Sequence, residues 1–177
     1  QTYRVGAISD GPKEIVLLAT GRSRTSPRAK PQIVRIDEQG FTPIYIGDQI
    51  SERISDLRMG PDGLYVTRIR QGKTAEGAWL RADVFETQTT SVMGLQQFPL
   101  SDGRYVVGRL YGDKAREFGG LEIHESGQAP IRLPVFRGVR TIEPYGLNQD
   151  GHLDLVVADG WHYRYGDEGR ARLLTFL

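Results

Sequence analysis

Four of the five Asp-Gly dipeptides in the chain recur at similar spacing, and each of these four is followed by a stretch of β-branched or aromatic residues. They stand at positions 10, 62, 102 and 150, so successive pairs are separated by 52, 40 and 48 residues. Asp-Gly is a strong hairpin signal, because glycine adopts the left-handed backbone that a tight turn needs. Architectures built from repeated four-stranded units have periods of roughly 40–50 residues. The spacing therefore predicts four repeated antiparallel units.

The rest of the chain favours a fold built only of strands. No apolar pattern with helical spacing persists beyond two turns, whereas short apolar runs are dense. We predict one all-β domain over residues 1–177, a β-propeller-like arrangement of about four blades of four antiparallel strands. Such blades either close into a ring or form an open arc. The expected blades are 1–50, 51–96, 97–138 and 139–177.

Within each blade, apolar runs separated by turn residues predict strands A to D in chain order. In the second blade these strands cover 54–59, 64–69, 79–85 and 90–95. The third blade begins with a strand at 97–100. In the fourth blade the strands cover 141–145, 153–158, 161–165 and 171–177.

Residues 146–160, GLNQDGHLDLVVADG, place oxygen-bearing side chains in a turn that precedes an apolar strand. Asn148 and Asp150 alternate, Gly151 permits a sharp turn, and Asp154 adds a carboxylate. Oxygen ligands of this kind suit a hard cation such as Ca²⁺. An Asx-rich hairpin without a metal would have the same pattern, and the sequence leaves both interpretations open.

The same stretch resembles an FG-GAP/VCBS repeat, the unit of a family of extracytoplasmic β-propellers. The family pattern is Asp-x-Asn/Asp-x-Asp-Gly-x-x-Asp-Leu, which this chain matches up to Leu155 except at Gly146, where the family has Asp. The resemblance implies a periplasmic or extracellular location and, with one ligand missing, weak Ca²⁺ binding. No other cofactor is required. The implied ligands are Asn148, Asp150, the backbone carbonyl of His152, and Asp154.

Composition excludes several kinds of chemistry. The chain has no cysteine, which rules out disulfides, thiolate metal sites and a cysteine nucleophile. It contains no Gly-x-Ser-x-Gly elbow, no phosphate-binding P-loop and no dinucleotide fingerprint. Its three histidines are not in metal-ligand spacing, and no apolar run of 18 residues could span a membrane. We therefore expect binding rather than catalysis.

Charged residues sort by sign between two sets of connections. Expected A–B and C–D turns are mostly acidic, whereas B–C and D–A connections are mostly basic, although the net charge is only +1. A propeller places these two sets on opposite faces, although solvation alone also puts charges into loops. The expected partner-binding arginines are Arg22, Arg24, Arg28, Arg68, Arg70 and Arg116. Trp79 and Trp161 are candidate interface anchors, unless they pack between blades.

These patterns predict a non-catalytic protein-interaction module, or an accessory or scaffold subunit of a larger assembly. Arginine binds carboxylates with two parallel hydrogen bonds, so the expected partner is an acidic protein surface. Anionic lipid headgroups are a second possibility. Nucleic acid is disfavoured, because aromatic residues do not interleave with the arginines. The alternative function is a carbohydrate-binding propeller, or a sugar-active or lyase-type enzyme, which needs a histidine, an arginine and a carboxylate in one pocket.

Overall fold

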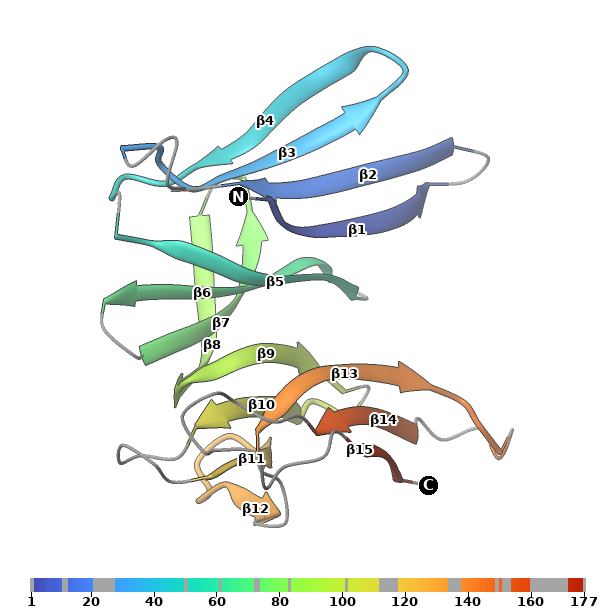
Figure 1. The fold of residues 1–177 in the computed structure, drawn as a ribbon. Helices are drawn as coiled ribbons and strands as arrows, with labels where there is room; N and C mark the ends of the chain where they lie inside the picture. The colour runs from blue at the N-terminus through green and yellow to red at the C-terminus, as the bar shows by residue number, and fades with distance from the viewer. Residues whose placement is uncertain are drawn as a thin grey trace.

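The computed structural model shows a chain of strands and turns arranged as four antiparallel sheets (Figure 1). It describes residues 2–10, 13–20, 28–49, 51–60, 62–71, 74–82, 84–100, 102–111, 118–133, 138–148, 150, 154–159 and 172–176. No helix is present among these residues. The prediction of an all-β fold is therefore confirmed.

Each sheet is a meander, in which neighbouring strands follow one another along the chain. The first sheet contains β1 (Thr2–Asp10), β2 (Lys13–Thr20), β3 (Gln32–Asp37) and β4 (Gly40–Ile46). The second contains β5 (Arg53–Gly60), β6 (Gly63–Gln71), β7 (Thr74–Arg81) and β8 (Val84–Val92). The third contains β9 (Gly94–Pro99), β10 (Tyr105–Tyr111), β11 (Phe118–His124) and β12 (Ile131–Leu133). The fourth contains β13 (Val139–Tyr145), β14 (Asp154–Asp159) and β15 (Arg172–Phe176).

In all four sheets the described residues of these Asp-Gly pairs lie at or within the connection between the first and second strand. The residues described there are Asp10, Asp62, Gly63, Asp102, Gly103 and Asp150. Gly63 and Gly103 have φ angles of +117° and +83°, a backbone region that glycine enters without steric cost. The predicted repeat is confirmed for the connection that each pair occupies, but the positions within it differ: Asp10 ends β1 opposite Lys13, whereas Gly60 rather than Asp62 ends β5 opposite Gly63. Gly11 and Gly151 lie outside the described residues.

The boundary between the second and third sheets differs from the prediction. The strand expected over 79–85 is two strands, because the chain turns at Ala82, which has a φ of 45°. Met93, with a φ of 55°, is the single residue between β8 and β9. The strand expected over 90–95 therefore ends earlier, and the third sheet begins at Gly94. Non-glycine residues with positive φ are uncommon, so the sequence carries no standard signal for either turn.

The fourth sheet also differs from the prediction. β15 pairs directly with β14, with Val157 opposite Leu174 in the antiparallel register. The third place in this sheet, which was assigned to 161–165, is thus taken by the strand expected to be fourth. Residues 160–171 lie outside the described part of the chain.

Two apolar cores lie between neighbouring sheets, which stack in chain order (Figure 1). The first core lies between the first two sheets and contains Ile33, Ile54, Leu57, Leu64 and Val66. The second lies between the last two sheets and contains Phe98, Val106, Leu121, Val139, Ile142, Leu155 and Val157. Side chains alternate between the two faces of a strand, so each sheet directs one set of apolar residues into its core. The described residues form no closed ring of sheets.

The contact between the second and third sheets combines the stacked rings of Tyr65 and Tyr105, 5.8 Å apart, with a set of buried polar groups. Thr89 donates a hydrogen bond to the side-chain oxygen of Gln97, and the hydroxyl of Tyr65 lies 3.4 Å from that of Thr89. The backbone N–H of Gln97 donates to the Thr67 hydroxyl over 3.1 Å. All four hydrogen-bonded residues are buried, so these bonds satisfy groups that would otherwise lose hydration without compensation. We call this set of four residues the polar seam.

Candidate functional site

β6 runs from the first apolar core to the molecular surface. Leu64, Val66 and Arg68 are spaced two residues apart, so they lie on one face of the strand, and Arg70 follows at an irregularity in the pairing of β6 with β7. The first three are buried, and Arg70 is exposed. One strand face thus changes from apolar to basic as it leaves the core.

Arg68 is held by carboxylates from two other segments. Its guanidinium lies 3.1 Å from Glu76 on β7 and 3.8 Å from Glu52 in the connection between β4 and β5. The guanidinium carbon lies 3.8 Å from the ring centroid of Phe85, which favours the cation. Arg68 is only 7 % exposed, so the expectation that it lies in a surface loop was wrong. Glu52 and Glu76, which come from two other segments, stabilise its charge in the interior.

Tyr45 completes this buried network. Its hydroxyl donates to the two oxygens of Glu52 at 3.0 and 3.1 Å. Burial, followed by the negative charge of Glu52, raises the pKa of Tyr45 to about 12. The phenol therefore stays protonated and remains a donor at neutral pH. The network fixes the end of β6 relative to the β4–β5 connection.

The β2–β3 connection is held against the same place. The backbone N–H of Gly47 donates to the carbonyl of Pro31 over 2.8 Å. A Cβ at Gly47 would lie 2.5 Å from Cγ of Pro31 and 2.8 Å from Oε2 of Glu52, so the close approach requires glycine. We call residues 28–31, 47–49, 51 and 52, together with the adjoining ends of β6 and β7, the basic edge, because the exposed Arg28, Lys30 and Arg70 outnumber the exposed Asp48 along it.

An open groove of about 380 Å³ lies on the basic edge. It is lined by Gln49 from the β4–β5 connection, Arg70 from β6, and Thr74 and Glu76 from β7. The buried Arg68 does not line the groove but forms an ion pair with the lining residue Glu76. The groove therefore offers an amide, a hydroxyl, one exposed cation and a carboxylate that is already paired.

The remaining expected partner-binding residues are divided. Arg28 is exposed on the basic edge, as Arg70 is. Trp79 is 5 % exposed and packs edge-on against Tyr65 at 5.0 Å, so it is a packing residue rather than a surface anchor. Outside the described part of the chain lie Arg22, Arg24, Arg116 and Trp161.

The predicted calcium loop is folded around Asp154. One oxygen of this carboxylate, Oδ2, accepts hydrogen bonds from the backbone N–H groups of Leu147 and Asn148 at 2.5 and 3.3 Å. The other, Oδ1, is buried and accepts no hydrogen bond from the described residues. A buried carboxylate oxygen of this kind fits a cation ligand.

The other expected ligands are partly committed to the turn. The side-chain oxygen of Asn148 accepts from the backbone N–H of Asp150 over 3.1 Å, and its amide donates to the Asp150 carboxylate over 3.0 Å. His152 lies outside the described residues. Among the residues that are described, no three His, Cys, Asp or Glu side chains gather as a metal-binding group. A cation in this loop would thus depend on Asp154 together with amide and backbone oxygens.

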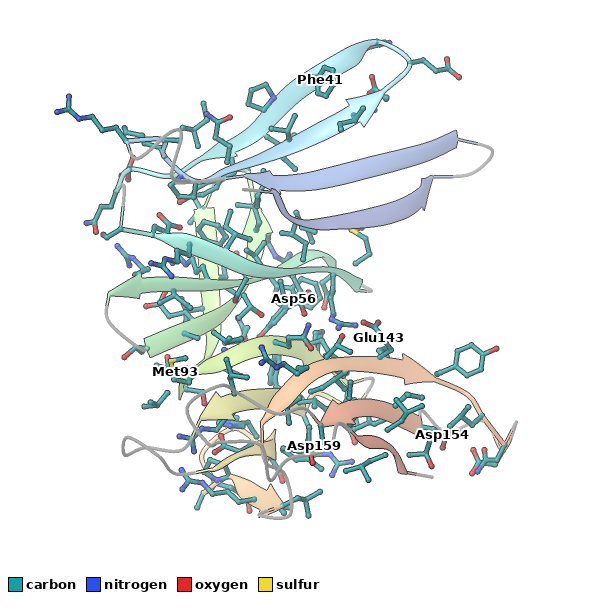
Figure 2. All side chains as sticks on the ribbon, viewed as in Figure 1. Phe41, Asp56, Met93, Glu143, Asp154 and Asp159 are labelled. Carbon is teal, nitrogen blue, oxygen red and sulfur yellow. The ribbon has the colours of Figure 1, made fainter. Side chains whose placement is uncertain are left out.

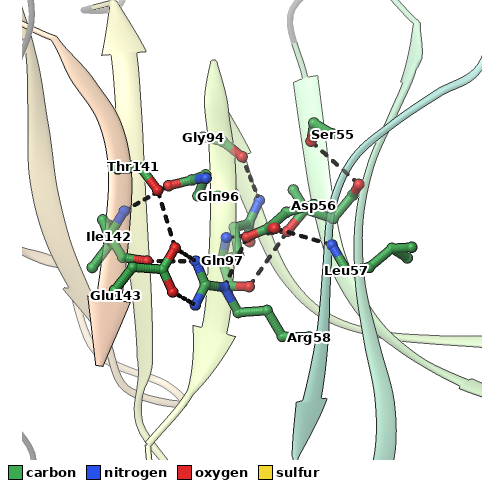
Figure 3. A network of polar contacts seen from close by, with 11 residues as sticks. Ser55, Asp56, Leu57, Arg58, Gly94, Gln96, Gln97, Thr141, Ile142 and Glu143 are labelled. Carbon is green, nitrogen blue, oxygen red and sulfur yellow. Dashed lines mark hydrogen bonds and ion pairs between the residues drawn. The ribbon is translucent and has the colours of Figure 1, made fainter. Parts of the chain in front are cut away.

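A polar network that sequence reasoning did not anticipate joins the first strands of three sheets (Figure 3). Arg58 on β5 bonds to Asp56 at 2.9 Å and to Glu143 on β13 at 3.1 Å, and it also donates to the carbonyl of Ile142. Gln96 on β9 accepts from the backbone N–H of Ile142 over 2.8 Å. Figure 2 shows Asp56 and Glu143 on the two sides of this junction. Partners 85 residues apart leave no local sequence signal.

A second unanticipated cluster surrounds Glu122 on β11. The carboxylate is 3 % exposed and lies within 2.7 Å of Arg109, 3.1 Å of Arg132 and 2.8 Å of His124. Arg109 also donates to the carbonyl of Val92, beside the one-residue connection between β8 and β9. Burial raises the pKa of Glu122, but hydrogen bonds from His124 and Arg109 outweigh this and lower it below its ordinary value. The charges pair with one another, which indicates a structural role at the joint between two sheets.

Comparisons of the chain with protein families, with characterised proteins and with solved structures give no match. The resemblance of residues 146–160 to FG-GAP/VCBS repeats therefore stays a prediction. The described residues include no helix that could cross a membrane.

Proposed function

We propose that the four sheets are blades of a propeller-like arrangement, with the first strand of each sheet nearest the centre. Two observations support this proposal. β5 contacts both β1 and β9, and Arg58 connects β5 with β13. First strands of consecutive blades meet in this way around a propeller axis.

We propose further that the protein is a non-catalytic interaction module that binds an acidic protein surface through its basic edge. The observation that carries this proposal is that residues 28–31, the β4–β5 connection and the adjoining ends of β6 and β7 follow one another along one edge, with Arg28 and Arg70 exposed on it. The buried Glu52–Arg68–Glu76 network holds this edge in place, which lowers the entropic cost of binding. The setting we propose is periplasmic or extracellular, as an accessory subunit of a larger assembly.

Charge reversal at the basic edge tests the docking proposal. The probe is a fluorescently labelled glutamate-rich peptide, titrated with the protein at low and at moderate salt while anisotropy is measured. Changing Arg28 and Arg70 together to Glu should weaken binding by at least about tenfold. Binding by the unaltered protein should also weaken with added salt, because salt screens exposed charges.

The matched control changes Arg35 and Arg81 to Glu. Both are about half exposed on strands outside the basic edge, and the double change alters net charge equally. An equal loss of binding in this control would show unspecific attraction and contradict a defined docking edge. If the protein does not bind the peptide but binds vesicles of anionic phospholipid, the proposed acidic protein partner is wrong and a membrane surface takes its place.

A further inference from the structure

We infer that the groove lined by Gln49, Arg70, Thr74 and Glu76 is a carboxylate-binding subsite that discriminates against phosphate. This inference rests on the proposed function, since it names the chemical group of the acidic partner that enters the basic edge.

Arg70 is the attractive element of the groove. It is exposed, and within the described part of the chain it has no carboxylate partner. Arg68, the neighbouring cation, already serves both Glu52 and Glu76. Arg70 therefore supplies the only lining charge without a counter-ion among these residues, and its planar fork matches the two oxygens of a carboxylate.

Two neutral groups add directional contacts. The side chain of Gln49 carries two amide donors, and Thr74 carries a hydroxyl that can donate or accept. They belong to different segments, the β4–β5 connection and the start of β7, so a group bound between them would bridge both. A groove of about 380 Å³ suits a side chain or a chain terminus better than an extended polymer face.

Glu76 is the discriminating element. It lines the groove, and its carboxylate shares Arg68 with Glu52, so two negative charges face one buried cation. Glu52, Glu76, Arg68 and Arg70 together carry no net charge, so a bound carboxylate brings one excess negative charge, whereas a phosphate monoester brings about two and is repelled more strongly by Glu76. Selectivity of this kind comes from a repulsive group placed against the wrong ligand.

The test compares two labelled peptides of equal length, one with glutamate and one with phosphoserine at the same positions. The unaltered protein should prefer the glutamate peptide, although the phosphoserine peptide carries more charge. Glu76→Gln should reduce or reverse this preference. Arg70→Gln should lower glutamate-peptide affinity by about tenfold, and Arg70→Lys should restore only part of it, because an ammonium lacks the planar fork.

Arg81→Gln is the matched control, since Arg81 is an exposed arginine whose partner is Glu86. Thermal unfolding of each variant verifies that the fold is intact. A preference for phosphoserine by the unaltered protein, or binding unaffected by Arg70→Gln, would overturn the subsite while edge docking through Arg28 could still hold. If neither the unaltered protein nor any variant binds the glutamate peptide, the proposed function itself is contradicted. If a short polyuronate binds more tightly than the glutamate peptide, and this binding depends on Arg70, the assignment of a protein partner is overturned.

Discussion

The guanidinium of Arg58 on β5 lies 3.1 Å from the carboxylate of Glu143 on β13, although 85 residues separate them in the chain. The same guanidinium bonds to Asp56, which is 1 % exposed, and lies 4.9 Å from the ring centroid of Phe98 on β9. One side chain thus ties together the first strands of the second, third and fourth sheets.

Removal of this side chain is expected to destabilise the whole domain. Arg58→Met keeps much of the side-chain volume but takes the cation away from the buried Asp56, which should cost about 3 kcal/mol. Glu143→Gln should cost less than about 1 kcal/mol, because Glu143 is 57 % exposed and water solvates the groups left behind. Urea unfolding measures both values. If both variants lose the same free energy of unfolding, the buried Arg58–Asp56 pair is not the main stabilising contact of Arg58.

The polar seam depends on the absence of a side chain at Gly77. A Cβ there would lie 2.6 Å from Gln97 Oε1 and 2.6 Å from Thr89 Oγ1, and it would also contact the hydroxyl of Tyr65. Gly77→Ala should therefore lower the free energy of unfolding by about 1–3 kcal/mol through overpacking. Gly120→Ala is the control, because its Cβ would meet only a carbonyl at 3.3 Å. A neutral Gly77→Ala would mean that the second and third sheets separate easily.

Acid should weaken the joint around Glu122. The pKa of this carboxyl is lowered in the folded protein, so its contribution to stability is present above the unfolded pKa of about 4.3 and is lost as pH falls through the folded pKa. Glu122→Gln should be less stable at neutral pH and should lose less stability on acidification. Chemical unfolding at a series of pH values measures this difference. Parallel pH curves for the two proteins would show that Glu122 does not contribute to acid sensitivity.

Calcium binding by the Asn148–Asp154 loop remains a prediction with a direct test. Calorimetric titration should show weak Ca²⁺ binding that disappears in Asp154→Asn, because the buried Oδ1 is the strongest ligand the described loop offers. Asp150→Ala should weaken Ca²⁺ binding more than Asp102→Ala does, which is the control change in the connection between the first two strands of the third sheet. Sub-micromolar affinity would mean that Gly146 does not cost the site a ligand. Binding unchanged by Asp154→Asn would place the ion elsewhere.

The sequence by itself determined the all-β class and the four repeated turns. Asp-Gly turns are local, because the glycine conformation and the Asp side chain act on the nearest backbone groups. The side chain of Asp102, for example, accepts from the backbone N–H of Arg104 only two residues away. Such signals need no partner from another part of the chain.

Tertiary structure alone decided which arginine is buried and which strand pairs with β14. Arg68 and Arg70 stand two residues apart near the end of β6, and the sequence carries no signal that separates them. Arg68 is buried because Glu52 and Glu76 reach it from two other segments, whereas Arg70 extends past those partners to the groove. β15 likewise lies beside β14 through register and core packing, which local propensity does not specify. Interactions between distant segments set the free energy of each placement, so they become visible only when the sheets are assembled.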